Sequence, residues 1–168
     1  MRFLFALFAV VALALPTAAL AGDEASGDPA SDFTLKSLAG DNVTLGDHLG
    51  KDVIVLSFWA TWCGPCLKEM PKLVAMQNEL ADKGVKIFWV SVDDAKDEAK
   101  INGIAKRFKV PAEQMLFDFE RKVVSTYHKR GVPPYTVVIG KDGTKILEKL
   151  GYTEGDEKKI HEKVLAAL

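Results

Sequence analysis

Two cysteines separated by two residues follow an apolar, strand-like segment, and this arrangement constrains the chain more than any other feature. Cys63 and Cys66 are the only cysteines in the sequence, and they come shortly after the continuous apolar run Val53–Trp59. Such a run has the length and composition of a central strand covered on both faces. A strand that leads into a C-x-x-C pair, with a helix starting at the pair, is the setting in which two thiols act as a redox-active disulfide.

A cysteine pair can also be one half of a zinc site. Structural zinc sites need four ligands, usually with a second Cys/His pair at short spacing. The three histidines of this chain stand apart from one another in the sequence: His48, His128 and His161. We therefore expect redox chemistry, and no metal, at the cysteine pair.

The N-terminus has the pattern of an export signal. Arg2 is followed by the apolar stretch Phe3–Leu15 and then by the small-residue sequence Ala19-Leu20-Ala21. These segments correspond to the charged region, the hydrophobic region and the A-x-A cleavage site of a signal peptide. The apolar stretch is short for a membrane span, which needs about 20 residues. Cleavage before Gly22 is thus favoured over an uncleaved membrane anchor, which stays the alternative.

We expect three parts along the chain: a signal peptide at residues 1–21, a short linker at 22–30 and one domain at 31–168. A chain of this length can bury one hydrophobic core of its own. The formal net charge is −1, and loss of the cation Arg2 with the signal makes it about −2. That near balance argues against nucleic acid as a partner, because nucleic-acid binding needs a basic face.

Strand and helix patterns alternate through the domain. Strands are expected over 53–59, 85–92, 115–118, 135–139 and 144–150, and helices over 66–83, 95–108, 123–128 and 156–168. The turn Lys141-Asp142-Gly143 is a strong hairpin signal between the last two strands. In the last helix, Ile160, Val164, Leu165 and Leu168 are expected to face inward. The order of elements predicts an α/β fold, with a mixed central sheet flanked by helices on both faces.

The sequence resembles the thioredoxin superfamily, and more closely its exported TlpA-like branch. Residues Trp59–Cys66 read W-A-T-W-C-G-P-C, which is similar to the thioredoxin active-site run, and Glu69-Met70-Pro71 is similar to a motif of the branch. The resemblance extends from about residue 30 to the end and includes an insertion between Val92 and Met115. It implies a thioredoxin fold with an N-terminal extension and a central insertion. It also implies thiol-disulfide oxidoreductase activity without a metal or organic cofactor.

The start of the helix offers a way to activate one thiol. Only a thiolate attacks a disulfide, and an ordinary cysteine has a pKa of ~8.5. Cys63 would face the unpaired N–H groups and the positive dipole end of the helix, whereas Cys66 would be more buried one turn later. We therefore expect Cys63 to attack and Cys66 to resolve. Gly64-Pro65 lets the helix begin within the motif, and Trp62 is predicted to be a partly exposed cover, with ordinary packing as the alternative.

Glu69 lies about one helical turn after Cys66 and would share its helix face. Two hypotheses remain open: a solvated surface glutamate or, as the resemblance implies, a carboxylate that influences the thiols. Many thioredoxins carry a buried aspartate at the position of Ser57, and its absence here favours Glu69 for that task. Asp93-Asp94 and His128, at the ends of elements, are expected to be solvated surface.

The resemblance further implies a cis-proline opposite the disulfide. Pro133 and Pro134 are both candidates, and Pro134 is favoured because a strand over Tyr135–Ile139 then has its usual length. A cis bond shapes a tight turn and allows the neighbouring backbone to approach an extended client chain. The residues expected to contact a client are Trp62, Gly64, Pro65 and Pro133.

Together these features predict a periplasmic, monomeric thiol-disulfide oxidoreductase whose clients are protein thiols or disulfides. The resemblance favours a reductase of specific disulfides, with apocytochrome c or copper-site thiols as typical clients and a membrane electron donor for re-reduction. One alternative is an oxidase or isomerase on the same fold, distinguished by its redox potential. The other is a redox-regulated copper metallochaperone, which would be expected to carry further soft ligands.

Overall fold

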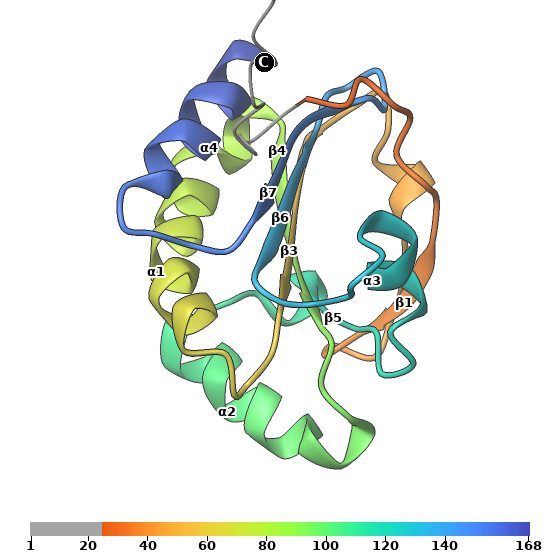
Figure 1. The fold of residues 1–168 in the computed structure, drawn as a ribbon, viewed down its shortest axis with the longest axis vertical. Coiled ribbons are helices and arrows are strands. Elements are labelled where there is room, and N and C mark those ends of the chain that lie inside the picture. Colours follow the sequence, from red (N-terminus) through yellow and green to blue (C-terminus); the bar gives the residue numbers. More distant parts are fainter. Residues whose placement is uncertain (1–24) are drawn as a thin grey trace, which may run out of the picture.

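A seven-stranded mixed sheet organises the chain, in a computed structural model that describes residues 25–168 (Figure 1). The strands are β1 (Thr34–Ser37), β2 (Asn42–Thr44), β3 (Val53–Trp59), β4 (Val85–Ser91), β5 (Met115–Phe117), β6 (Tyr135–Ile139) and β7 (Lys145–Leu150). The α-helices are α1 (Gly64–Leu80), α2 (Glu98–Phe108), α3 (Lys122–Tyr127) and α4 (Asp156–Ala166). The expected signal peptide, residues 1–21, lies outside the described residues.

The strand order is β2-β1-β5-β4-β3-β6-β7. β3, β4 and β5 are parallel, and the remaining pairs are antiparallel. Helices α1 and α4 lie against one face of the sheet and α3 lies on the other (Figure 1). The predicted mixed sheet with helices on both faces is therefore confirmed. Strands β1 and β2, which precede β3 in the chain, were not predicted as strands.

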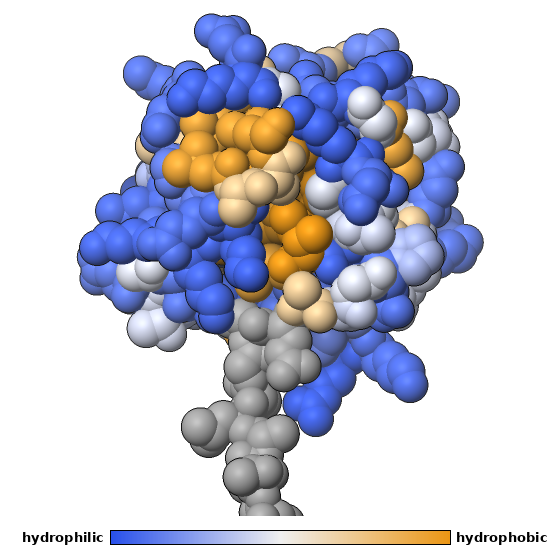
Figure 2. Space-filling model, turned by 90° about the horizontal axis from the view of Figure 1, so that it is seen from above, coloured by the Kyte–Doolittle hydropathy of each residue, from blue (hydrophilic) through white to orange (hydrophobic). Residues whose placement is uncertain are grey.

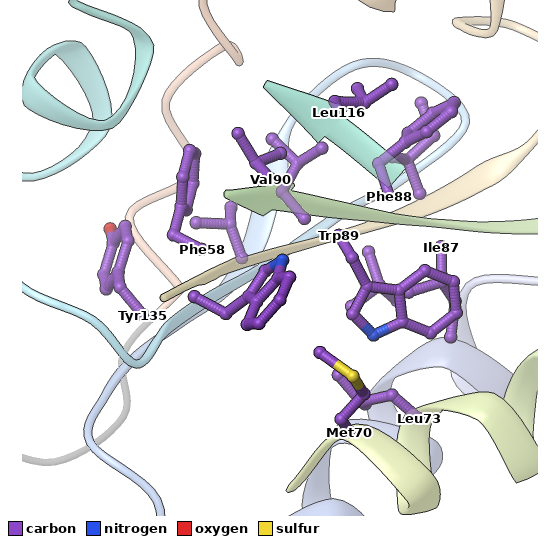
Figure 3. Packing of buried hydrophobic residues seen from close by; sticks show 14 of the residues in the cluster. Phe58, Met70, Leu73, Ile87, Phe88, Trp89, Val90, Leu116 and Tyr135 are labelled. Atoms are coloured by element: carbon purple, nitrogen blue, oxygen red, sulfur yellow. The ribbon is translucent and has the colours of Figure 1, made fainter. Parts of the chain in front are cut away.

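The core forms on both faces of the central strands. Every residue of β3 is buried, as the apolar run predicts. Figure 3 shows Trp89 of β4 pointing toward Met70 and Leu73 of α1, while Phe88 and Val90 point to the opposite face. Burying one large apolar side chain contributes roughly 1.5–3 kcal/mol, so the packing of Trp89 against Met70 and Leu73 helps to fix α1 on the sheet.

A side chain completes the outer edge of β4. β5 pairs with β4 only at Trp89–Ser91, so the first half of β4 has no strand neighbour on that side. The N–H of Ile87 donates to Gln77 Oε1 at 2.6 Å, and Gln77 Nε2 donates to the carbonyl of Val85 at 3.2 Å. Gln114 Nε2 also donates to Gln77 Oε1, at 2.8 Å. One glutamine of α1 thus satisfies backbone groups that a missing strand would have paired.

The buried face of the last helix contains fewer residues than the sequence predicted. Ile160 and Val164 are buried, but Leu165 is 44% exposed and Leu168 39%, so the inward orientation expected for those two leucines is wrong. α4 meets the sheet along a single stripe beside β6 and β7, because it covers the edge of the sheet rather than its centre. Figure 2 looks onto the end of the molecule where α4 ends and shows apolar side chains gathered there.

The last residues of the expected linker are part of the fold. Gly27 N–H donates to the carbonyl of Lys145 at 3.2 Å, and Lys145 N–H donates to that of Asp28 at 2.9 Å. Ala30 N–H donates to the carbonyl of Gly143 at 2.8 Å. This segment therefore extends the sheet at the β6–β7 turn. Within residues 25–168, no helix is both long enough and apolar enough to cross a membrane.

Candidate redox-active site

Cys63 and Cys66 form a disulfide at the start of α1. Cys63 is the N-cap of the helix, with extended backbone angles, and the N–H of Cys66 donates to Cys63 Sγ at 3.3 Å. Pro65 occupies the first turn, where its missing N–H removes no helical hydrogen bond. The predicted helix start within the motif is confirmed. On reduction, a thiolate at Cys63 would face this N–H and the positive end of the helix.

The disulfide is nearly covered, and its neighbour Trp62 is not. Cys63 is 5% exposed and Cys66 2%, so the greater burial expected for Cys66 is a small difference. Trp62 is 61% exposed, which is incompatible with ordinary core packing. Its side chain borders a shallow groove toward α2, which is also lined by Thr61, Asp97, Lys100, Gly103, Ile104 and Arg107. Exposed aromatic surface beside the sulfurs suits contact with a polypeptide.

The cis peptide bond lies between Pro133 and Pro134, at the position that the sequence favoured. Phe58 of β3 pairs with Tyr135 of β6, so the start of β6 lies beside the end of β3. The loop that contains Pro133 and Pro134, called the proline loop below, therefore lies at the same end of the sheet as the disulfide. Pro133 and Pro134 are buried, whereas Val132 just before them is exposed.

Glu69 is buried in the layer between α1 and the sheet, so the solvated-surface hypothesis for this residue is wrong. It is 1% exposed, and Thr136 Oγ1 donates to Glu69 Oε1 at 3.1 Å. Burial raises the pKa of Glu69 from 4.5 to about 7, although the Thr136 hydrogen bond and the charge of Lys149 oppose that rise. Such a carboxyl can hold or release a proton near neutral pH.

The register of the sheet relates Glu69 to the position where thioredoxins carry their aspartate. Ser57 of β3 pairs directly with Thr136 of β6, and paired residues point to the same face of the sheet. Glu69 binds Thr136 from the helix above. A carboxyl from α1 thus reaches the strand next to Ser57. This placement fits the departure seen in the sequence, where the strand itself supplies no carboxylate.

Asp93 is a site residue that the sequence analysis missed, because it was expected on the solvated surface. It is 1% exposed. Its carboxylate accepts the Thr61 N–H at 2.9 Å, the Thr61 hydroxyl at 2.8 Å and the Ser91 hydroxyl at 2.9 Å. Asp93 therefore fastens the end of β4 to the loop that leads into Cys63. A carboxylate just after a strand is usually solvated. No local sequence pattern could indicate the contact with Thr61, which lies 32 positions earlier in the chain.

Asp94 and His128 were also expected at the surface, and the structure confirms this fully only for Asp94. Asp94 is exposed, as predicted, and pairs with Lys96. The His128 ring is partly buried and packs on Tyr135 with centroids 4.9 Å apart. In the part of the chain that the structure describes, no cluster of three or more His, Cys, Asp or Glu residues could hold a metal ion.

A disulfide at the N-cap of a helix that follows a central strand, with a cis-proline loop at the same end of the sheet, defines a thioredoxin-fold thiol-disulfide oxidoreductase. The chain belongs to the AhpC/TSA family, whose model matches residues 26–146. It is 34% identical over 124 residues to a thiol-disulfide oxidoreductase ResA of Bacillus cereus. That match spans 74% of this chain and 68% of the relative.

Solved structures agree with this assignment. A Chlorobium tepidum structure described as a thiol:disulfide interchange protein DsbE has a TM-score of 0.72 and 31% identity, covering 84% of this chain and 96% of that one. The thioredoxin domain of a thiol-disulfide oxidoreductase from Bacteroides vulgatus has a TM-score of 0.69 and 25% identity, covering 83% and 98%. The fold and the class of activity expected from the resemblance are confirmed.

Proposed function

We propose that the protein is a reductase of specific protein disulfides that works outside the cytoplasm, with Cys63 as the attacking thiol and Cys66 as the resolving thiol. The observation that carries this assignment is the Cys66 N–H directed at Cys63 Sγ at the N-cap. It stabilises negative charge on Cys63 and not on Cys66. Gly64-Pro65 between the cysteines, as in reducing thioredoxins, supports the reducing direction.

The reaction then needs only the two thiols and the client. The Cys63 thiolate attacks one sulfur of the client disulfide, a mixed disulfide forms, and the other client sulfur leaves as a thiolate. Cys66 loses its proton and attacks Cys63 Sγ. The mixed disulfide breaks, and the second client sulfur leaves as a thiolate that takes up a proton. Two electrons have passed to the client, and the protein holds the Cys63–Cys66 disulfide. No metal or organic cofactor is required.

Glu69 is the proposed acceptor for the proton of Cys66. It follows Cys66 by three residues on α1, so both side chains lie on the same face of the helix. Its pKa of about 7 is suited to proton exchange near neutral pH, because an acid or base works best when its pKa is close to the working pH.

Client chains are proposed to bind at Trp62, Gly64, Pro65 and the proline loop. Trp62 supplies exposed aromatic surface beside the disulfide. An extended client could pair with the loop as an added strand. Because Pro133 has no N–H, that position could offer a client only its carbonyl. Side chains and the flanking residue Val132 would then have to contribute more of the binding than backbone pairing does.

Trapping experiments test the roles of the two thiols. A Cys66→Ser variant should keep a competent attacker that nothing resolves, so mixed disulfides with clients should accumulate on Cys63. A Cys63→Ser variant should trap few clients, because the remaining thiol lacks the N-cap. Equal trapping by both variants would refute the assignment, and the captured proteins would identify the clients.

The redox potential tests the direction of electron flow. Equilibration with glutathione should give a potential near the ~−270 mV of thioredoxin, as expected for a reductase. A value near ~−120 mV would mean an oxidant instead. A reductase in an oxidising compartment would depend on a membrane electron donor for its own reduction.

Export is supported by the pattern at residues 1–21 of the sequence. Mass spectrometry of the protein from its host should find a periplasmic form that begins at Gly22. An intact N-terminus found only in membranes would show that this segment is an anchor.

A further inference from the structure

The sheet places a lysine on the face where Glu69 is buried. Lys149 of β7 pairs directly with Thr136 of β6, and directly opposed residues point to the same face. Thr136 uses that face to reach Glu69. Lys149 therefore projects into the layer that α1 and α4 cover. There its Nζ lies 3.0 Å from Asp156 Oδ2, in the first turn of α4.

The Lys149–Asp156 pair is largely withdrawn from water. The Lys149 side chain is 10% exposed and that of Asp156 22%. Lysine is seldom buried to this degree, and the cost of desolvating two charges offsets much of their attraction. The pair is therefore a weak source of stability. Its charges nevertheless act strongly on an ionisable neighbour, because water screens buried charges only weakly.

Four titratable groups outside α1 interact electrostatically with Glu69. The cation Lys149 lowers the pKa of Glu69, whereas the anions Asp156 and Glu157 raise it. Tyr152 donates its hydroxyl to Glu157 Oε2 at 3.0 Å and so holds that carboxylate at the start of α4. The Lys149–Asp156 pair thus contains the one cation among these groups and one of its two opposing anions.

We propose that Lys149 and Asp156 are positioning residues for Glu69, and that their opposed charges set the pH at which its buried carboxyl gives up a proton. Lys149 favours the carboxylate, and Asp156 restrains Lys149 while repelling the same carboxylate. The consequence for Cys66 rests on the proposed function, since it requires Glu69 to accept the proton of that thiol. The charge relationship itself does not depend on that step.

Direct titration of Glu69 tests the proposal. In the oxidised protein labelled with ¹³C at glutamate carboxyls, the Glu69 resonance is assigned by its loss in a Glu69→Gln variant. Lys149→Met should raise the midpoint of the Glu69 titration, and Asp156→Asn should lower it, each by at least about 0.5 in pH. Opposite directions are the signature, because general loosening of the site would move both variants the same way.

Matched variants separate charge from structure. Lys149→Arg keeps the cation and should leave the midpoint near that of the wild type. Lys158→Met removes an exposed lysine of α4 and should not move it. If Lys149→Met does not fold, the Asp156→Asn and Lys149→Arg variants still decide the question. Midpoints that stay unchanged in Asp156→Asn, or that shift upward there, would overturn the proposal.

A second measurement distinguishes this proposal from the proposed function. The pH dependence of thiol exchange by the reduced protein should follow the Glu69 midpoint from variant to variant. If the midpoints move in opposite directions while the exchange profiles stay fixed, the Lys149–Asp156 relationship holds and the role of Glu69 as proton acceptor is wrong. If the profiles follow the midpoints, both are supported.

Discussion

Cys63 and Glu69 lie on or beside the same helix, yet their environments adjust their ionisation by different means. Cys63 lies at the positive end of the helix dipole, since it caps α1 and its Sγ accepts a hydrogen bond from the N–H of Cys66. Glu69 is buried beneath α1, and this burial is the main cause of its raised pKa. N–H donors directed at a thiolate favour its charged form, whereas desolvation of a carboxyl favours its neutral form. The helix therefore promotes an anion at its N-cap and retains a proton on Glu69, about two turns further on.

Replacing Glu69 with Gln should remove a pH-dependent part of the stability. Because the pKa of Glu69 is raised from 4.5 to about 7, the folded protein binds more protons than the unfolded chain between these values. The free energy of unfolding therefore falls as the pH rises through that window, by on the order of 3 kcal/mol. Urea denaturation of the oxidised protein from about pH 4.5 to about pH 7.5 should show this decline in the wild type. The same decline in the Gln variant would contradict the raised pKa.

Asp93→Asn should loosen the loop before Cys63. The two Asp93 oxygens accept from the Thr61 N–H, the Thr61 hydroxyl and Ser91, and an asparagine amide would direct N–H groups at some of these donors. We expect a loss of roughly 1–3 kcal/mol in stability and thiol exchange slowed by about tenfold. Asp94→Asn, at the exposed neighbour, is the control. Exchange rates equal to wild type would show that Thr61 needs no such anchor.

Helix α1 carries Cys66, Glu69 and Gln77 and is capped by Cys63. The sequence predicted this helix well, because the signals for it are local. Its apolar spacing and the helix start in the cysteine motif are both read from neighbouring residues. The structural role of Gln77 was not predicted, because it depends on the free edge of β4. That edge is free only because β5 is too short to pair with the first half of β4. Local periodicity predicts elements, whereas polar bridges between elements depend on how those elements meet.

Gln77→Leu should be among the more damaging substitutions on α1. It keeps the side chain at similar bulk but leaves the N–H of Ile87 and the carbonyl of Val85 without their partner. An unsatisfied buried polar group costs about 1–3 kcal/mol, so a loss in the upper part of that range or beyond is expected in urea denaturation. Asn78→Ala, one position along on the exposed face, should change stability by less than about 0.5 kcal/mol. Similar losses in both variants would argue that the bridge is unimportant.

The assembled molecule brings together segments that the sequence keeps far apart. The fold class, the cysteine pair and the cis-proline position followed from the motifs and the family resemblance. The positions of Asp93, Thr136 and Lys149 could not, because each depends on strand register. Leu165 and Leu168 show the same limit from the other side: their spacing fits a helix stripe, but only the packed molecule shows how narrow that stripe is.

A chain that begins at Ser31 should be less stable than one that begins at Gly22. It lacks the backbone hydrogen bonds of Gly27, Asp28 and Ala30 to the β6–β7 turn. Three partly exposed bonds should together contribute roughly 1–3 kcal/mol, measured by urea denaturation. Thiol exchange should be unchanged, because the lost contacts lie away from the disulfide. Equal stability of the two chains would place all of residues 22–30 outside the folded unit.

The attachment of residues 27–30 also determines how the domain would be oriented on a tether. These residues join the sheet beside the β6–β7 turn, where β3 begins, while the disulfide follows the end of β3. The strand between them spans about 20 Å. If the chain were held at a surface by its N-terminus, the sulfurs would point outward, toward clients arriving from solution. A donor embedded in that same surface could reach them only if the domain tipped over or the donor itself extended outward.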